Sequence, residues 1–277
     1  MTDLNIPLAG VIGNPVAQSR SPQLFRHWLK TYDRKGFYIP IHVTEANLAD
    51  VIRTLPKMGF VGCNVTAPHK VYALEIADLA TDRATLIGAA NTLIFRKDGK
   101  IHADNTDGYG FIANLKQGAP GWAPSIGPAA VLGAGGAARA VIASLIDVGV
   151  QEIFLSNRTR PKAEALKSSF GTKITVVDWV QAGNMLEDAA TVINTTSLGM
   201  TGKPEFRVPL DGLRRGTVVT DLVYSPLKTR LLIEAEAAGC VVVDGLGMLL
   251  HQAVPGFERW FGVRPEVDVD TRAAVLA

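Results

Sequence analysis

Hydrophobic runs of strand length alternate with amphipathic stretches along the chain, and turn residues separate them. This alternation predicts an α/β protein with mostly parallel sheets that are covered on both faces. Helices are expected over Pro22–Lys30, from about Glu45 and after Pro68. The strands expected in the first half are Leu8–Gly13, Gly36–Val43, Phe60–Thr66 and a hairpin of Asn91–Arg96 with Lys100–Ala103.

A second α/β pattern follows Gly118–Pro128, a segment with three prolines and three glycines that reads as a domain boundary. Its expected strands are Ala129–Leu132, Gln151–Asn157, Lys173–Asp178, Thr191–Thr195, Thr217–Val223 and Cys240–Val243. The amphipathic segment Met248–Arg259 is expected to pack back on the first domain. We therefore predict two domains, 1–117 with 247–277 and 118–246, with a ligand cleft between them and closure hinged near 118–128 and 243–247.

Composition narrows the class of protein. Of the 277 residues, 47% are hydrophobic and 19% are charged, which supplies ample core and disfavours global disorder. A net charge of +2 without basic runs disfavours a nucleic-acid binder. Cys63 and Cys240 have no metal-ligand spacing and suggest buried free thiols. With no apparent signal or membrane segment, we expect a cytoplasmic protein that binds no metal.

The most specific local pattern is an apolar strand that enters a glycine turn and then a helix rich in small residues. Gly133 permits the tight turn, Gly135 lets a phosphate approach the backbone, and Ala138 lets the helix pack close to the strand. Free N–H groups at the helix N-terminus favour an anion there. This pattern predicts the Rossmann-like, doubly wound domain of a dinucleotide-binding protein.

The end of the next strand distinguishes the two nicotinamide cofactors. An acidic residue would favour the ribose hydroxyls of NAD, whereas basic residues favour the 2′-phosphate of NADP. Here Asn157, Arg158, Thr159 and Lys162 occur without an acid between them. The same loop would also serve as an ordinary helix start, with Thr159 as N-cap and Pro161 in the first turn. We predict NADP, with NAD as the alternative.

In the first half, several polar residues follow expected strands, where open α/β sheets bind ligands. Ser19 and Ser21 have the spacing to bind a small carboxylate or polyol, although, taken alone, the motif favours ordinary helix capping with Pro22 in the first turn. Lys70 follows the third strand, where a solvated lysine is the ordinary alternative. His69 is expected to be structural or exposed.

Eight short motifs occur in one order along the chain. They are Ser-x-Ser-Pro, Asn-Val-Thr-x-Pro-x-Lys, Gly-Ala-x-Asn-Thr, Asp-Asn-Thr-Asp-Gly, Gly-Ala-Gly-Gly-Ala, Asn-Arg-Thr, Asn-x-Thr-Ser-Leu-Gly-Met and Asp-Gly-Leu-Gly-Met-Leu. In this order they resemble the shikimate dehydrogenase family over essentially the whole length. The chain departs from the usual family pattern at Gln18, at His69, where Phe is frequent, and at Lys162, where Arg is common.

The resemblance implies an N-terminal substrate-binding and catalytic domain, an NADP-binding domain and reversible hydride transfer between 3-dehydroshikimate and shikimate. It implies Lys70 and Asp107 as catalytic residues. Substrate ligands by the same resemblance are Ser19, Ser21, Thr66, Asn91, Tyr224 and Gln252. Cofactor-binding residues by the same resemblance are Gly133, Ala134, Gly135, Gly136, Ala137, Asn157, Arg158, Thr159, Lys162, Thr195, Gly245 and Met248.

Two alternatives remain open from the sequence. A quinate/shikimate or aminoshikimate dehydrogenase, using NAD, would carry much the same motifs. A non-catalytic nucleotide or metabolite sensor would keep the fold, but it need not keep both Lys70 and Asp107. The sequence leaves a monomer and a homodimer equally open.

Overall fold

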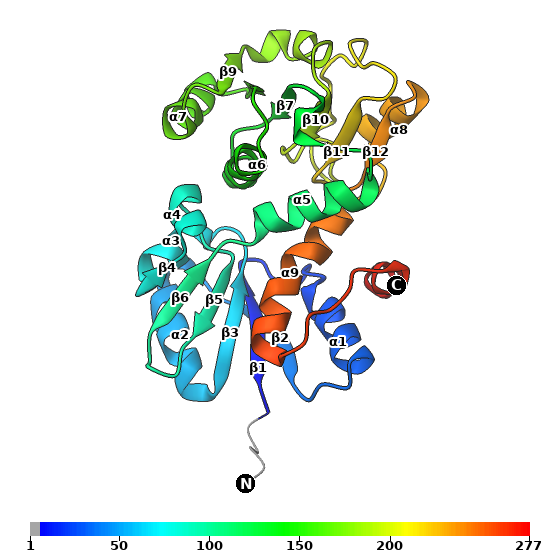
Figure 1. Ribbon diagram of the computed structural model, residues 1–277. Coiled ribbons are helices and arrows are strands. Elements are labelled where there is room, and N and C mark those ends of the chain that lie inside the picture. Colours follow the sequence, from blue (N-terminus) through cyan, green and yellow to red (C-terminus); the bar gives the residue numbers. More distant parts are fainter. Residues whose placement is uncertain (1–5) are drawn as a thin grey trace. The chain divides into compact units, whose positions relative to one another are not determined.

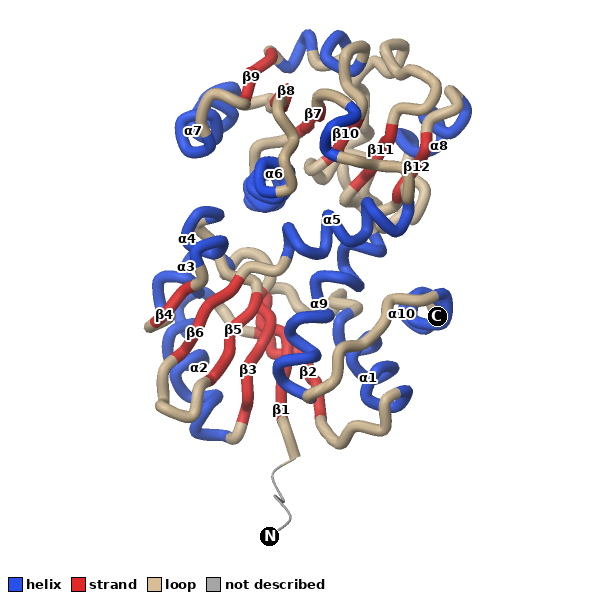
Figure 2. Tube along the Cα trace, viewed as in Figure 1, coloured by secondary structure: helices blue, strands red, loops and turns tan. Residues whose placement is uncertain are grey.

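The computed structural model describes residues 6–277, which fold into two compact units (Figures 1 and 2). Unit 1 comprises the chain up to Thr106 together with Leu249–Ala277, and unit 2 comprises Asp107–Met248. By compactness the first division therefore falls after Thr106, ahead of the boundary that we expected at 118. The second division falls inside a helix, α9 (Leu246–Phe261), which is longer at both ends than the amphipathic segment predicted from the sequence.

Unit 1 is built on a mixed six-stranded sheet with the order β2-β1-β3-β5-β6-β4. The strands β1, β2 and β3 are parallel, and β5 runs antiparallel to both of its neighbours, as the predicted hairpin requires. The strands are β1 (Leu8–Gly13), β2 (Phe37–His42), β3 (Phe60–Val65), β4 (Leu79–Ala80), β5 (Thr92–Phe95) and β6 (Ile101–Asp104). Its helices are α1 (Ser21–Thr31), α2 (Leu48–Thr54), α3 (Lys70–Ile76), α4 (Asp82–Ile87) and α10 (Val269–Leu276).

The two faces of this sheet are covered by different helices. Alternating strand residues such as Ile12, Cys63 and Leu93 pack with buried side chains of α2 and α3. On the other face, Phe25 of α1 stacks on Tyr38 and lies against Phe257 of α9, with ring centroids 3.7 and 5.5 Å away. This aromatic cluster, with α1 beside α10 in Figure 1, joins the C-terminal segment to the first strands.

Unit 2 is a parallel six-stranded sheet with the order β12-β11-β10-β7-β8-β9. Counted from β7, this is the strand order 3-2-1-4-5-6 of a doubly wound dinucleotide fold, and it reverses between β7 and β10. The strands are β7 (Ala129–Leu132), β8 (Ile153–Ser156), β9 (Ile174–Val177), β10 (Thr191–Asn194), β11 (Val218–Asp221) and β12 (Val241–Val243). The helices are α5 (Asp107–Gly118), α6 (Gly136–Asp147), α7 (Arg160–Phe170), α8 (Arg230–Ala237) and the start of α9.

Both faces of this sheet are buried, which explains why its strands read as short apolar runs without alternation. One face packs on α5, α6 and α7, through residues such as Phe111, Val141 and Leu166. The opposite face packs on α8 and on the stretch before β11. Within residues 6–277, no helix combines the length and the hydropathy that a membrane span requires.

Candidate functional site

Polar residues of unit 1 gather at the edge where β1, β3 and β6 end and β5 begins. Ser19 follows β1, Thr66 follows β3, Asn91 precedes β5, and Thr106 follows β6. Because β5 runs antiparallel to β3, its first residue lies beside the end of β3, as the pairing of Asn64 with Thr92 shows. The sheet order therefore places the predicted substrate residues of this unit at one edge.

Asn91 is the centre of a buried hydrogen-bond network at this edge. Its Nδ2 donates to Oγ1 of Thr106 at 3.0 Å and to Oε1 of Gln252 at 3.1 Å. Its Oδ1 accepts from the Thr106 backbone N–H at 2.8 Å, and the Thr106 hydroxyl donates to the carbonyl of Gln252 at 2.8 Å. Two residues that are 161 positions apart in the sequence are thus held together, as the motif assignment requires.

A second branch connects the first motif to the same edge. The Ser21 backbone N–H donates to the Ser19 hydroxyl at 3.3 Å, and Ser21 hydrogen-bonds to Tyr38. Burial raises the pKa of Tyr38, so its phenol stays protonated and donates to Oδ1 of Asn64 at 2.7 Å. Nδ2 of Asn64 then donates to the Asn91 carbonyl at 3.2 Å. The N-cap residue of α1 is Arg20 and not Ser21, and Ser21 hydrogen-bonds to Tyr38, so simple helix capping does not account for Ser21.

Lys70 is the first residue of α3 and is half-buried, with its carbonyl accepting from the Ala90 N–H at 2.8 Å. His69, the residue before it, is 1% exposed, and its Nε2 lies 2.7 Å from the Val43 carbonyl. Of the two expectations for His69, the structural one is confirmed and the exposed one is wrong. Packing of this histidine against the turn after β2 fixes the backbone on which Lys70 begins its helix.

Asp107 directly follows the Thr106 network and is the first residue of α5 in unit 2. Its side chain is 8% exposed, and a carboxylate at this position is favoured by the free N–H groups of the helix N-terminus. The first acid of the same motif, Asp104, has a different role. It accepts from Arg83 and Thr81, so it anchors α4 and is not a free carboxylate.

The glycine turn of unit 2 has the geometry that its motif predicts. Gly133 has φ +109°, and a Cβ there would lie 2.6 Å from Oγ1 of Thr195, so only glycine suits the position. A Cβ on Gly135 or Gly136 would meet nothing within 4 Å, so space is open beside the N-terminus of α6. Ala138 is fully buried against the sheet. The turn therefore offers backbone N–H groups and room for an anion.

A cavity of about 600 Å³ opens beside this turn. Its lining contains eight residues that the sequence assigned to the cofactor: Gly133, Ala134, Gly135, Asn157, Arg158, Thr159, Lys162 and Thr195. Asn157 ties the wall together, since its Oδ1 accepts from the Ala134 N–H at 3.1 Å and its Nδ2 donates to the Thr159 carbonyl at 2.8 Å. Thr159 is the N-cap residue of α7, as expected, but its side chain makes no cap hydrogen bond, so its hydroxyl is not used by the helix.

Seven lining residues were missed by the sequence assignment: Trp179, Thr196, Ser197, Leu198, Pro204, Glu205 and Arg207. Thr196, Ser197 and Leu198 belong to the Asn-x-Thr-Ser-Leu-Gly-Met motif, which could have revealed them. Trp179 and Arg207 lie in segments without any motif. Only the fold brings them to the cavity, because they follow β9 and β10, which are parallel and end at the same edge of the sheet.

Four assigned cofactor residues do not line this cavity: Gly136, Ala137, Gly245 and Met248. Gly245 is buried under the end of β11, and a Cβ there would lie 2.4 Å from the Leu222 carbonyl. Met248 packs against the α5–α6 side of the core. Tyr224 is half-buried after β11. These positions belong to unit 2, whereas Ser19, Ser21, Thr66, Lys70, Asn91 and Gln252 belong to unit 1.

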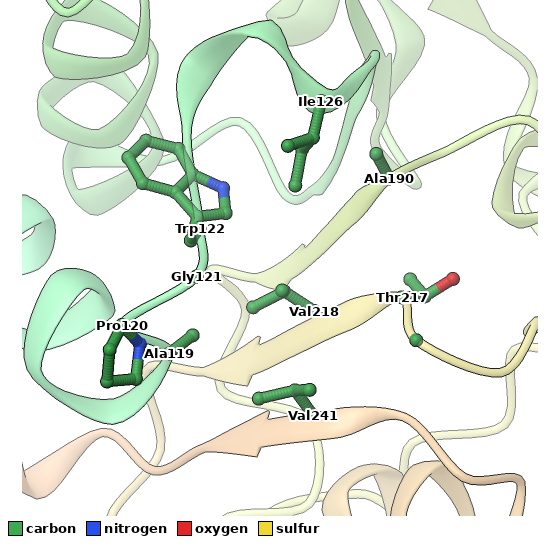
Figure 3. A pocket seen from close by; sticks show the side chains of 10 residues that line it. Ala119, Pro120, Gly121, Trp122, Ile126, Ala190, Thr217, Val218 and Val241 are labelled. Atoms are coloured by element: carbon green, nitrogen blue, oxygen red, sulfur yellow. The ribbon is translucent and has the colours of Figure 1, made fainter.

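A second cavity, of about 510 Å³, lies at the amino ends of the unit 2 strands (Figure 3). Trp122 and Ile126 form one wall, Ala190 and Thr217 lie just before β10 and β11, and Val241 begins β12. None of its ten lining residues is charged. Because ligands of doubly wound sheets bind at the carboxyl ends, the glycine-turn cavity is the candidate nucleotide site.

Three family models match the chain in order. They describe a shikimate dehydrogenase substrate binding domain at residues 11–93, a shikimate/quinate 5-dehydrogenase at 126–201 and a shikimate 5′-dehydrogenase C-terminal domain at 245–275. The chain is 72% identical over 278 aligned residues to "Shikimate dehydrogenase (NADP(+))" of Cereibacter sphaeroides, with 100% of both chains covered.

Solved structures agree with this similarity. Shikimate 5-dehydrogenase of Thermus thermophilus, in complex with NADP(H) and shikimate, matches with a TM-score of 0.87 and 33% identity, covering 98% of each chain. Quinate dehydrogenase of Corynebacterium glutamicum, in complex with NAD, matches with a TM-score of 0.89 and 30% identity, again covering 98% of each chain.

Proposed function

The chain belongs to the shikimate dehydrogenase family, and we propose that it transfers hydride reversibly between NADPH and 3-dehydroshikimate, giving shikimate and NADP⁺. The observation that carries this proposal is the 72% identity, over the full length of both chains, to an NADP-dependent shikimate dehydrogenase. The retention of both Lys70 and Asp107 supports an enzyme over a non-catalytic sensor.

The residues of unit 2 fit the cofactor. Open space beside Gly135 and Gly136 leaves room for a pyrophosphate at the N-terminus of α6. Arg158 and Lys162 line the same cavity and supply cationic groups for a 2′-phosphate, whereas an acid that would favour the NAD ribose is absent between Asn157 and Lys162. When bound, NADPH supplies the hydride itself.

The residues of unit 1 fit a small polyhydroxylated carboxylate. Ser19, Ser21 and Thr66 supply hydroxyl groups, and Asn91 and Gln252 supply amides whose orientation is fixed by the Thr106 network. Fixed donors and acceptors favour a substrate that matches them, because a wrong hydroxyl pattern leaves buried polar groups without partners. We assign Tyr224 to the same substrate, on the family motif.

The proton comes from Lys70. Hydride addition to a ketone leaves an alkoxide oxygen that must gain a proton, and an ammonium group both donates it and stabilises the developing negative charge. We assign Asp107 to orienting the substrate hydroxyl and the lysine. In the reverse direction, neutral Lys70 accepts the proton from the shikimate hydroxyl.

A matrix of activities tests the proposal, with shikimate and quinate each assayed with NADP⁺ and with NAD⁺. We expect the highest kcat/KM for shikimate with NADP⁺. A higher value for quinate, or for NAD⁺, would overturn the substrate or the cofactor assignment. Tight NADP⁺ binding without turnover of either substrate would favour the sensor.

We also expect the protein to act in the cytoplasm, as a monomer or a homodimer. Both cysteines are free and buried, which suits a reducing compartment. Light scattering of the purified chain at several concentrations separates the two oligomeric states.

A further inference from the structure

We propose that Asp221 is a positioning residue of the nucleotide cavity, acting through Asn194 on the stretch 195–198 that lines it. The inference rests on the proposed assignment of that cavity to NADP. Asp221 ends β11, is fully buried, and does not line the cavity itself.

The carboxylate of Asp221 is held by neutral donors. Its Oδ1 accepts from Nδ2 of Asn194 at 2.9 Å and from the Val223 N–H at 3.0 Å, and its Oδ2 accepts from the Thr229 hydroxyl at 2.7 Å. Burial raises its pKa to about 6, against the lowering effect of these hydrogen bonds. At neutral pH it is therefore a buried anion.

The cationic groups on the adjoining segment have other partners. Lys228 pairs with Glu236, and Arg230 pairs with Glu234. A buried anion without a cationic partner is costly, so a role in stability alone does not explain the residue. Its distinctive property is that an ionised carboxylate only accepts hydrogen bonds.

That property orients the side chain of Asn194, which pairs with Asp221 across β10 and β11. Because only the NH₂ group of Asn194 can face a carboxylate, its Oδ1 is turned toward the loop after β10. There Oδ1 accepts from the Thr196 N–H at 3.0 Å and from the Thr196 hydroxyl at 2.7 Å. The Thr196 hydroxyl accepts in turn from the Leu198 N–H at 3.1 Å.

The loop held in this way is one wall of the cavity. Thr195, Thr196, Ser197 and Leu198 all line it, as do the basic residues Arg158 and Lys162 after β8. The start of the loop is tied to β7, since the Thr195 hydroxyl donates to the Leu132 carbonyl at 2.8 Å. After Thr195, the hydrogen bonds that run from Asp221 through Asn194 to Thr196 and Leu198 fix the backbone conformation of the loop.

The decisive variant is Asp221→Ala. We expect the Kd for NADP⁺, measured by isothermal titration calorimetry, to rise about tenfold, the factor that corresponds to one ordinary hydrogen bond. Without ligand, amide hydrogen exchange at Thr196 and Leu198 should accelerate. The KM for shikimate and kcat at saturating NADP⁺ should stay within about twofold, which a general loss of structure would not allow. Asp221→Asn keeps one oxygen that can accept from Asn194 but replaces the other with a donor, so it should restore only part of the affinity.

Two further variants keep the test decisive. If Asp221→Ala does not fold, Thr229→Val removes one anchor of the carboxylate and should raise the Kd about threefold, by loosening without removing the hydrogen bonds that run through Asn194. Ser156→Ala is the control. Ser156 is the last residue of β8, and its buried hydroxyl has no hydrogen-bond partner, so its removal should leave the Kd unchanged.

An unchanged Kd and unchanged exchange in a folded Asp221 or Thr229 variant would overturn the proposal. If Arg158→Ala also leaves the Kd unchanged, the cavity assignment fails; if Arg158→Ala raises it, only the positioning role fails.

Discussion

The carboxyl edges of the two sheets carry different kinds of candidate site. In unit 1 the side chains assigned to the ligand, such as Asn91 and Gln252, are also the ones that hold the structure together. In unit 2 the cavity is lined by an open glycine turn and by exposed basic residues, while the structural bonds lie behind them at Asp221. The residues assigned to ligand contact are the same as those that stabilise the fold in the first unit, and they are different residues in the second.

Two of the buried acids, one in each unit, illustrate the same contrast. Asp104 ends β6 and is paired with Arg83, so its pKa is lowered on balance, although burial alone would raise it. Asp221 ends β11 among neutral donors, so burial prevails and raises its pKa to about 6. Both acids stand at the carboxyl end of a strand. The structure of unit 1 favours the ionised form of Asp104, whereas that of unit 2 disfavours the ionised form of Asp221.

The largest expected effect is on catalysis in unit 1. Lys70→Ala should lower kcat by about 10²- to 10⁴-fold, the usual contribution of a positioned proton donor, with a smaller change in the KM for shikimate. Steady-state kinetics measure it. Lys57→Ala, an exposed lysine of the same unit, is the control and should behave as the unaltered protein. Unchanged turnover in Lys70→Ala would remove this lysine from the mechanism.

Asn91→Ala tests whether ligand contact and stability are combined in unit 1. The change strips the Thr106 N–H of its acceptor and Gln252 of its donor, so the free energy of unfolding should fall by about 1–3 kcal/mol. The KM for shikimate should rise in the same variant. Urea unfolding and kinetics provide the two measurements, with exposed Asn47→Ala as the control. A rise in KM without a loss of stability would contradict the comparison.

Arg158→Ala tests the opposite expectation for unit 2. Removing an exposed cation should raise the KM for NADP⁺ about tenfold, as expected for a lost charge-assisted hydrogen bond, and leave the KM for NAD⁺ little changed. Thermal unfolding should not shift measurably, because the side chain is exposed. Lys167→Ala, on the last turn of α7, controls for charge alone. Equal effects on both cofactors would exclude a role at the 2′-phosphate.

The smallest expected effects are opposite pH dependences of stability. Because the folded pKa of Asp221 exceeds its unfolded value of 3.8, this acid increases stability as pH falls through about 6 toward 4, and Asp221→Asn should lose that gain. Asp104, with a lowered pKa, stabilises the fold above pH 3.8 and loses that contribution below it. Urea unfolding across this pH range measures both, as differences from the unaltered protein. A flat difference for Asp221→Asn between pH 7 and 5 would contradict the assignment.

Much of the fold was predictable because it depends on local pattern. The apolar runs located each long strand within a residue or two, and the predicted hairpin of Asn91–Arg96 with Lys100–Ala103 is that of β5 and β6. The two-residue strand β4, with two exposed residues, and helices α4, α5 and α10 were not predicted. Such short or partly exposed elements are stabilised by contacts that their own sequence does not reveal, as Thr271 of α10 shows by accepting from Trp28 of α1 at 3.3 Å.

Sequence alone determined which chemical groups are available: the glycine turn, the basic residues after β8, and the Lys70, Asn91 and Asp107 motifs. For the glycine turn the reason is steric. The positive φ of Gly133 suits only glycine, and the strand, the turn and the helix follow one another within a few residues of sequence. Which side chains hydrogen-bond to one another was decided by the tertiary structure alone. Asn91 bonds to Gln252, Tyr38 bonds to Asn64, and Asp221 bonds to Asn194, which precedes the 195–198 loop. These partners meet because of strand order and helix packing, which depend on burial summed over the whole domain and not on any local stretch of residues.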